Sequence, residues 1–246
     1  MELDMLGWTL AVIAAMSVGL SKGGLPVISS IAVPLLAQVM NPVQAAGLLL
    51  PVYVVSDMVG LWAWRKDFDR RVLAIVAPAA LIGIGFGWAT ASLVPERAVA
   101  VMVGLIGAVF ALNAIFRRTV VAEPRAPRVA PGVFWGAIAG FTSFVSHSGG
   151  PPWQVYALPL GMSKTRFAGT STILFAFINA AKLLPYYALG QLNADSLGIA
   201  SVLMLPAALA VLAGVWLVRV IPQVLFFRLV IWALLLISVR LIWQAV

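Results

Sequence analysis

The chain has 246 residues, of which 63% are hydrophobic and only 10% are charged, whereas roughly 25% of an average soluble domain is charged. With a mean hydropathy of +1.05, one globular core of this size could not bury all the apolar surface, so most of the chain must contact lipid. These values exclude soluble enzymes and nucleic-acid-binding proteins, and the formal net charge of +8 reflects topology because the basic residues lie mainly in short loops.

Six apolar runs are each long enough to cross the roughly 30 Å of hydrocarbon as a helix. They are residues 43–64, 72–94, 98–116, 167–188, 196–218 and 222–245. The chain opens on the acidic segment Met-Glu-Leu-Asp, whereas a secretory signal opens with basic residues. We therefore expect the first apolar run to belong to the mature protein.

Two further runs, 5–40 and 132–162, are interrupted near their middle by a glycine pair followed by proline. The breaks are Gly23, Gly24 and Pro26 in the first run, and Gly149, Gly150, Pro151 and Pro152 in the second. Glycine lets the backbone turn and proline suits the first turn of the next helix. Each run is therefore predicted to be a pair of helices of about 13–17 residues, which either cross or re-enter. In both cases the chain returns to the side that it left.

Basic residues in the turns set the predicted orientation. One membrane topology places eleven of them on the same side of the membrane: Arg65, Lys66, Arg70, Arg71, Arg117, Arg118, Arg125, Arg128, Lys164, Arg166 and Arg219. Placing that side in the cytoplasm leaves both termini outside. The prediction is a multi-pass protein of about ten membrane segments in the bacterial inner membrane.

The two halves of the chain share landmarks in the same order. Pro78-Ala-Ala-Leu81, followed by Trp88, recurs as Pro206-Ala-Ala-Leu209, followed by Trp216. The glycine breaks also lie at matching places. Because each half holds five segments, an odd number, the second half enters the membrane inverted, as in many secondary transporters. The predicted organisation is a first repeat at 1–116, a cytoplasmic linker at 117–131 and a second, inverted repeat at 132–246. The alternative is that repeated proline and glycine merely reflect membrane composition.

Four ionisable residues within the apolar runs each cost roughly 2.5–3.5 kcal/mol to insert. They are Lys22, Asp57, His147 and Lys182. Lys22 and His147 lie at the two breaks, where helix starts favour anions. We expect free backbone N–H groups at Gly24-Leu25 and Gly150 to face a negative ligand, and the hydroxyls of Ser21, Ser146 and Ser148 to add donors.

Two helix stripes carry the remaining polar residues. Asn179, Lys182 and Tyr186 share one face, and Tyr53 and Asp57 share the matching face in the first half. Three alternatives stay open. Asp57 and Lys182 could form a buried ion pair that only fixes packing, Lys22 could extend to the cytoplasmic surface, and His147 could have a structural role.

At these breaks and stripes the sequence resembles the sulfite exporter TauE/SafE family of bacterial inner-membrane anion transporters. The matching stretches are GLSKGGLPVISSIAVP from Gly19 to Pro34, SHSGGPPWQVYALPLGMSKTRFAGTS from Ser146 to Ser171, and NAAKLLPYYALGQL from Asn179 to Leu192. The resemblance spans nearly the whole chain. It implies transport, mostly outward, of small sulfur-containing or carboxylate anions such as sulfite, thiosulfate, sulfoacetate or other sulfonates.

The prediction is therefore an all-α anion exporter that works by alternating access at a site near the membrane midplane. Its substrate-binding residues are Ser21, Lys22, Gly23, Gly24, Ser146, His147, Ser148, Gly149, Gly150, Asn179, Lys182 and Tyr186, with Asp57 and His147 as candidates for proton or charge coupling. No cofactor or metal is predicted, and the partners are a small anion and the lipid bilayer.

Several alternatives to this reading are retained. One is a proton- or sodium-coupled importer of small carboxylates or sulfonates, and another is an accessory subunit without transport activity. An intramembrane enzyme is disfavoured, because the single histidine excludes the usual metal-ligand sets and no nucleophile elbow is visible. The sequence leaves open the anion, the direction, the coupling and whether the protein forms a homodimer.

Overall fold

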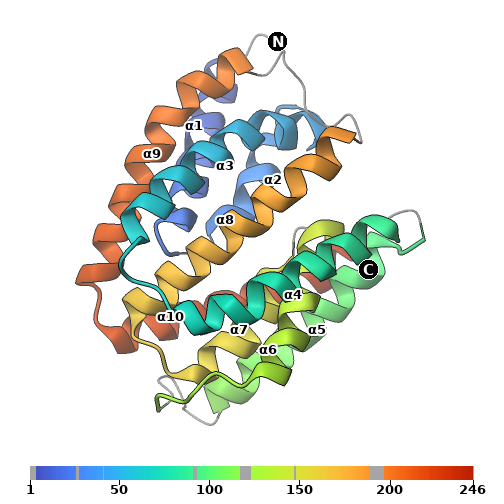
Figure 1. Cartoon of the computed structure of the whole chain (residues 1–246). Helices are drawn as coiled ribbons and strands as arrows, with labels where there is room; N and C mark the ends of the chain where they lie inside the picture. Colours follow the sequence, from blue (N-terminus) through green and yellow to red (C-terminus); the bar gives the residue numbers. More distant parts are fainter. Residues whose placement is uncertain are drawn as a thin grey trace. The chain divides into compact units, whose positions relative to one another are not determined.

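The computed structural model describes residues 4–25, 28–40, 42–90, 93–116, 123–146, 148–188 and 197–245, without the side chains of 30, 42–43, 46–47, 96, 184–188, 197 and 245. Over these residues the chain is helical and has no strand (Figure 1). The elements in chain order are α1 (Met5–Lys22), η1 (Ile28–Ile31), α2 (Ala32–Leu36), α3 (Pro42–Trp64), α4 (Arg70–Ala89), α5 (Glu96–Phe116), α6 (Val129–Ser146), α7 (Gly150–Ala157), η2 (Leu158–Leu160), α8 (Lys164–Ala188), α9 (Leu197–Val220) and α10 (Gln223–Ala245).

Six helices in the described part of the chain are long and apolar enough to cross a membrane, namely α1, α4, α5, α6, α9 and α10. Helix α3 adds a shorter apolar stretch, Leu48–Trp64. Helix α8, with 25 residues, is long enough but less apolar. These helices indicate a polytopic membrane protein, as its composition predicted.

The interrupted runs differ from the predicted pairs of similar short helices. Helices α1 and α6 have 18 residues each, whereas α2 has 5 and α7 has 8. The first members are longer because nothing breaks the helix before the glycine pair. The second members are short: η2 follows α7 directly and ends at Gly161, whose φ of 64° stops the helix. The predicted length of about 13–17 residues for each member is therefore wrong.

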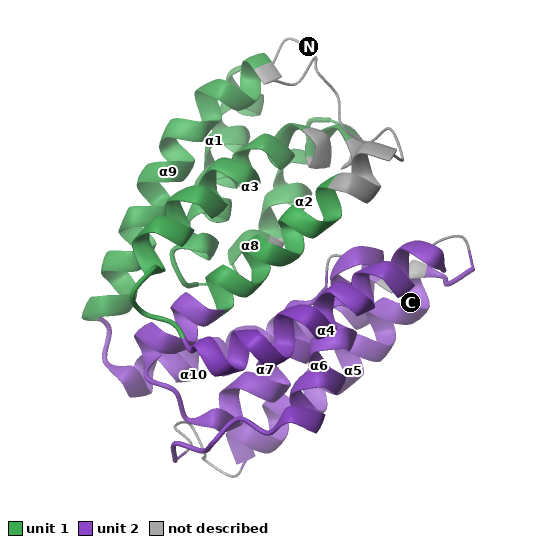
Figure 2. Cartoon of the chain, in the orientation of Figure 1, with its two compact units in different colours: residues 1–68, 171–220 green, residues 69–170, 221–246 purple. Residues whose placement is uncertain are grey.

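The chain forms two compact units, shown in separate colours in Figure 2. Unit 1 comprises residues 1–68 and 171–220, and unit 2 comprises residues 69–170 and 221–246. Unit 1 therefore holds α1 to α3, most of α8, and α9, while unit 2 holds α4 to α7 and α10. Each unit takes helices from both predicted repeats.

In unit 1, α9 packs against α1 and α3. The contact with α1 is a close approach of two backbones, because a Cβ at Gly19 would lie 2.1 Å from the carbonyl oxygen of Ala207. Around it lies a core of fully buried small and aliphatic side chains from α1, α2, α3 and α9. Close packing of small residues is the usual way in which membrane helices associate.

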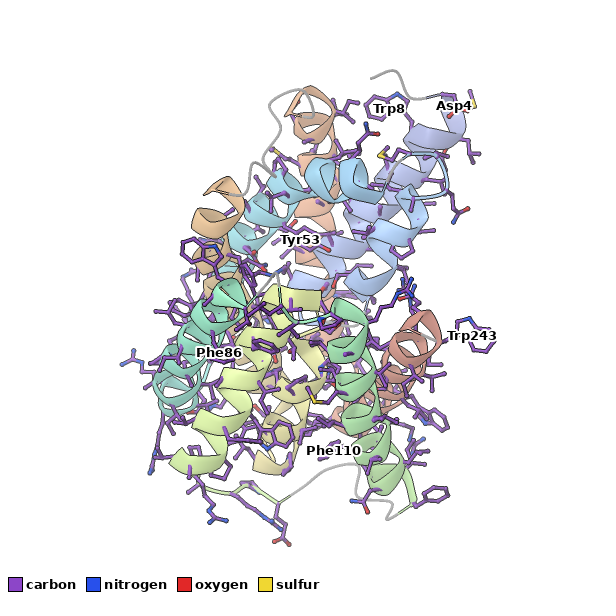
Figure 3. The ribbon with its side chains drawn as sticks, turned by 90° about the vertical axis from the view of Figure 1, so that its right-hand side faces the viewer. Asp4, Trp8, Tyr53, Phe86, Phe110 and Trp243 are labelled. Atoms are coloured by element: carbon purple, nitrogen blue, oxygen red, sulfur yellow. The ribbon has the colours of Figure 1, made fainter. Side chains whose placement is uncertain are left out.

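In unit 2, α4 packs against α6, and α5 packs against α10. The contact of α4 with α6 is again very close, since a Cβ at Gly140 would lie 2.0 Å from the carbonyl oxygen of Ala80. Phe86 of α4, labelled in Figure 3, lies 6.1 Å from Phe141 of α6, measured between ring centres. In both units, a helix that carries the Pro-Ala-Ala-Leu motif thus packs against the long helix that precedes a glycine break.

Candidate functional site

Unit 1 contains a buried cluster of charged and polar side chains. The Nζ of Lys22 lies 2.7 Å from Oδ1 of Asp57, and each of these side chains is only 7% exposed. The side-chain amide of Asn179 donates a hydrogen bond to the other carboxylate oxygen, Oδ2, at 2.8 Å. The cluster therefore joins α1, α3 and α8 around one carboxylate.

Local structure places Lys22 at this point. It is the last residue of α1, where the negative end of the helix dipole favours a cation. Its carbonyl oxygen accepts a hydrogen bond of 3.1 Å from the hydroxyl of Thr172 on α8. Its ammonium also lies 5.6 Å from the ring centre of Tyr53, which precedes Asp57 by one turn of α3 and is labelled in Figure 3.

Lys182 brings a second cation to the same region. It follows Asn179 by one turn of α8, is only 5% exposed, and is close enough for its charge to interact with both Lys22 and Asp57. The two lysines and the aspartate carry a formal charge of +1 when all three are ionised. A buried group of this kind can bind a small anion through charge and through N–H donors.

The structure corrects one alternative for Lys22. Its side chain does not extend to a surface, because it is buried and paired with Asp57. The sequence offered Lys182 as the partner of Asp57; the structure adds direct contacts of the carboxylate with Lys22 and Asn179, and the charge of Lys182 interacts with Asp57 as well. Asp57 and Asn179, which lie on the matching faces predicted for the two halves, are therefore hydrogen-bonded to each other.

The free amides expected at the first break are not free. The N–H of Gly24 donates to the carbonyl of Ser21 at 3.1 Å, and the N–H of Leu25 donates to that of Leu20 at 3.3 Å. This is a Schellman cap, made possible by the φ of 111° at Gly24. The expectation of free donors at Gly24-Leu25 is therefore wrong, because the glycine pair closes a helix end.

The second break lies in unit 2. There the N–H of Ser148 donates to the carbonyl of Thr142 at 3.1 Å. Helix α7 then starts at Gly150 with prolines in its first turn, as predicted, and Gly149 is its N-cap. His147 and the side chain of Tyr186 lie outside the described residues. A single site that combines both breaks stays a prediction.

The serine hydroxyls have acceptors within the protein. Ser146 donates to the carbonyl of Thr142 at 3.1 Å, and Ser148 donates to that of Ser146 at 2.8 Å. Ser21 donates to the hydroxyl of Ser29 at 3.1 Å. In this conformation their hydrogens point to these oxygens, so the lysines and Asn179 are the stronger candidates for anion contact.

Sequence reasoning missed Thr172. It lies seven residues before Asn179, on the same face of α8, and a Cβ at Gly60 would lie 2.8 Å from its methyl group. This spacing could have identified it. A metal centre has no support in the described part of the chain, where no three His, Cys, Asp or Glu residues form a group that could hold an ion.

The model of the sulfite exporter TauE/SafE family matches residues 9–241 of the chain. The chain belongs to this family. The resemblance drawn from the two breaks and from the Asn179 stretch is thereby confirmed. Comparison with curated proteins gives no match, and comparison with solved structures gives none. The buried cluster of Lys22, Asp57 and Asn179 thus belongs to a transmembrane transporter of the TauE/SafE family.

Proposed function

We propose that this TauE/SafE protein exports small sulfur-containing anions, such as sulfite, thiosulfate or sulfoacetate, across the bacterial inner membrane. The observation that carries the proposal is the buried cluster of Lys22, Asp57, Asn179 and Lys182 within apolar helices. The TauE/SafE family supports a sulfite-type substrate.

The charge of the cluster favours an anion. Asp57 is the only acidic residue within the predicted membrane segments, so the sequence provides one carboxylate for two lysines there. Keeping an excess positive charge in an apolar environment is costly. A bound anion offsets this positive charge, and Asn179 and Lys182 offer it N–H donors from one face of α8.

The membrane potential supplies a driving force for export. With the cell interior negative, each unit of negative charge that leaves gains about 2.3 kcal/mol per 100 mV. An exporter of anions therefore needs no coupling ion. Transport by alternating access requires two arrangements of the helices, and the two compact units are the natural bodies to rearrange.

The proposed architecture is an inverted repeat of two five-segment halves with both termini outside. Supporting it, the Pro-Ala-Ala-Leu motifs of α4 and α9 have corresponding roles in their own units, where Ala80 contacts α6 and Ala207 contacts α1. In each contact, the fourth α-helix of one half, α4 or α9, packs against the first helix of the other half, α6 or α1. This exchange is what a duplicated and inverted pair of halves would produce.

A coupled importer is the second candidate, and the position of Asp57 favours it. The Asp57 carboxylate is paired with the ammonium of Lys22, so an anion that binds Lys22 must compete with this carboxylate. The groups facing Asp57 are Lys22, Asn179, Lys182 and Tyr53. If Asp57 takes up a proton when the anion binds, Lys22 is released, and an inward proton gradient could drive import against the membrane potential.

Proteoliposomes with an imposed potential test the proposal. We expect sulfite or sulfoacetate flux to increase with voltage, to be lost in Lys182→Met, and to persist in Lys66→Met, whose lysine is exposed. Flux that ignores voltage, follows an inward proton gradient and loses its pH dependence in Asp57→Asn would replace the exporter with the importer. A folded protein that neither binds nor moves any of these anions would support the accessory subunit.

A further inference from the structure

A cavity of about 300 Å³ lies in unit 1, where the ends of α3 and α9 meet. We call it the rim cavity. Trp62 and the turn after α3 line one side, and α9 lines the other. Its lining includes Trp62, Arg65, Lys66, Asp67, Leu212 and Arg219. The buried cluster of Lys22 and Asp57 is not part of this lining.

Positive charge dominates the polar part of the rim cavity. Among the described residues that line it, three are cationic and one is acidic, a net formal charge of +2. The guanidinium of Arg65 lies 4.7 Å from the ring centre of Trp62 and donates to the backbone carbonyl of that residue. These contacts hold Arg65 at the edge of the cavity.

Arg219 faces the same space from α9. Its guanidinium lies 3.5 Å from Oδ2 of Asp67 and 5.8 Å from the ring centre of Trp64. The side chains of Arg219 and Asp67 are 54% and 39% exposed, and an exposed ion pair of this length is weak. A phosphate can therefore compete with Asp67 for hydrogen bonds from Arg219.

The rest of the lining is apolar. Leu212 and Val215 share a face of α9 with Arg219, and Leu212 lies about 10 Å along the helix from it, at 1.5 Å per residue. Leu212 and Trp62 are 44% and 60% exposed. Because α9 is apolar enough to cross a membrane, this apolar wall runs from the charged end of the helix toward the hydrocarbon.

We propose that the rim cavity binds the headgroup of an anionic phospholipid. The lipid phosphate lies between Arg65 and Arg219, and an acyl chain follows Leu212 and Trp62. A free inorganic anion would use the cations but would gain nothing from the apolar wall, whereas a lipid uses both. Basic pockets at the ends of membrane helices are suited to such headgroups. The inference does not depend on the transported substrate.

Native mass spectrometry of the detergent-purified full-length protein tests the proposal. The probes are dioleoyl phosphatidylglycerol and dioleoyl phosphatidylcholine, which have the same acyl chains. We expect phosphatidylglycerol to be retained preferentially, and retention to fall roughly tenfold in the double variant Arg65→Gln/Arg219→Gln. Arg71→Gln is the matched control, because Arg71 is an exposed arginine at the start of α4 that does not line the cavity.

Three results would overturn the assignment. They are equal retention of the two lipids, undiminished phosphatidylglycerol in the double variant, and displacement of the lipid by millimolar inorganic phosphate, which would indicate a site for a soluble anion. If the double variant does not purify as a folded protein, the single variant Arg219→Gln takes its place, and retention equal to wild type would then refute the proposal. Sulfite transport by the variants reports separately on the substrate site.

Discussion

Replacing both members of the Lys22–Asp57 pair should separate its role in packing from its role in transport. At 2.7 Å, two unit charges attract each other by about 6 kcal/mol at an effective dielectric constant of ~20. Removing one partner leaves the other charge buried, so Lys22→Met and Asp57→Leu should each lower the free energy of unfolding by about 3–5 kcal/mol.

The double variant Lys22→Met/Asp57→Leu should be much less destabilised than the sum of the two single variants. No charge is left unpaired between these positions, and the main remaining loss is the acceptor of Asn179, which costs about 1–3 kcal/mol. The loss of unfolding free energy in the double variant should therefore be smaller than the sum of the two single losses by at least about 3 kcal/mol. The assay is unfolding by SDS in mixed micelles, followed by far-ultraviolet circular dichroism.

Transport by the same double variant decides between the two roles. We expect a folded protein that moves no sulfite in proteoliposomes, because the ammonium that would contact the anion is gone. Wild-type flux from the double variant would show that the pair only fixes helix packing. Additive destabilisation by the single variants would refute the ion pair itself as a stabilising contact.

Two further predictions concern unit 2: one tests the packing of α4 against α6, and the other tests the N-cap of α4. Gly140→Ala should lower the free energy of unfolding by about 1–3 kcal/mol, because its Cβ would meet the backbone of Ala80 at 2.0 Å; Gly85→Ala, which meets nothing within 4 Å, is the control, and equal effects in the two variants would contradict the close contact. Asp69→Ala should lower the free energy of unfolding by about 1 kcal/mol, because the Asp69 carboxylate accepts a hydrogen bond from the N–H of Val72 at the start of α4. In the same SDS titration Asp69→Asn should retain most of that stability, and a loss equal to that of the alanine variant would argue against the cap.

The buried polar residues could be found from sequence because charge in an apolar run is costly. That argument selected Lys22, Asp57 and Lys182, and the face of α8 added Asn179. The direct contact between Asp57 and Lys22 could not be found in this way. A helical stripe tells which residues share a face, whereas pairing depends on which helices are neighbours, and α1 meets α3 at a point that no local pattern reveals.

The first break shows a second limit. Two glycines followed by proline suit either an open helix start or a closed helix end. The choice depends on the backbone at Gly24, whose positive φ turns the chain back so that its own amides cap α1. The lengths of α2 and α7 were equally out of reach, because α2 ends at Leu36 without a glycine or proline beside it and α7 passes directly into η2, which Gly161 ends.

The interleaved composition of the units has a consequence for biosynthesis. When a ribosome has completed residues 1–170, all of α1 to α3 has been made, yet α9, which covers the Gly19 face of α1, is still to come. Until α8 and α9 are synthesised, the early helices therefore lack part of their packing. The small residues on the Gly19 face of α1 have no covering helix, and the Lys22–Asp57 pair lacks its hydrogen bond from Asn179. A nascent chain stalled at this stage should be a substrate for membrane quality control. Mutations in α8 or α9 should therefore increase the degradation of chains whose first helices are already in the membrane.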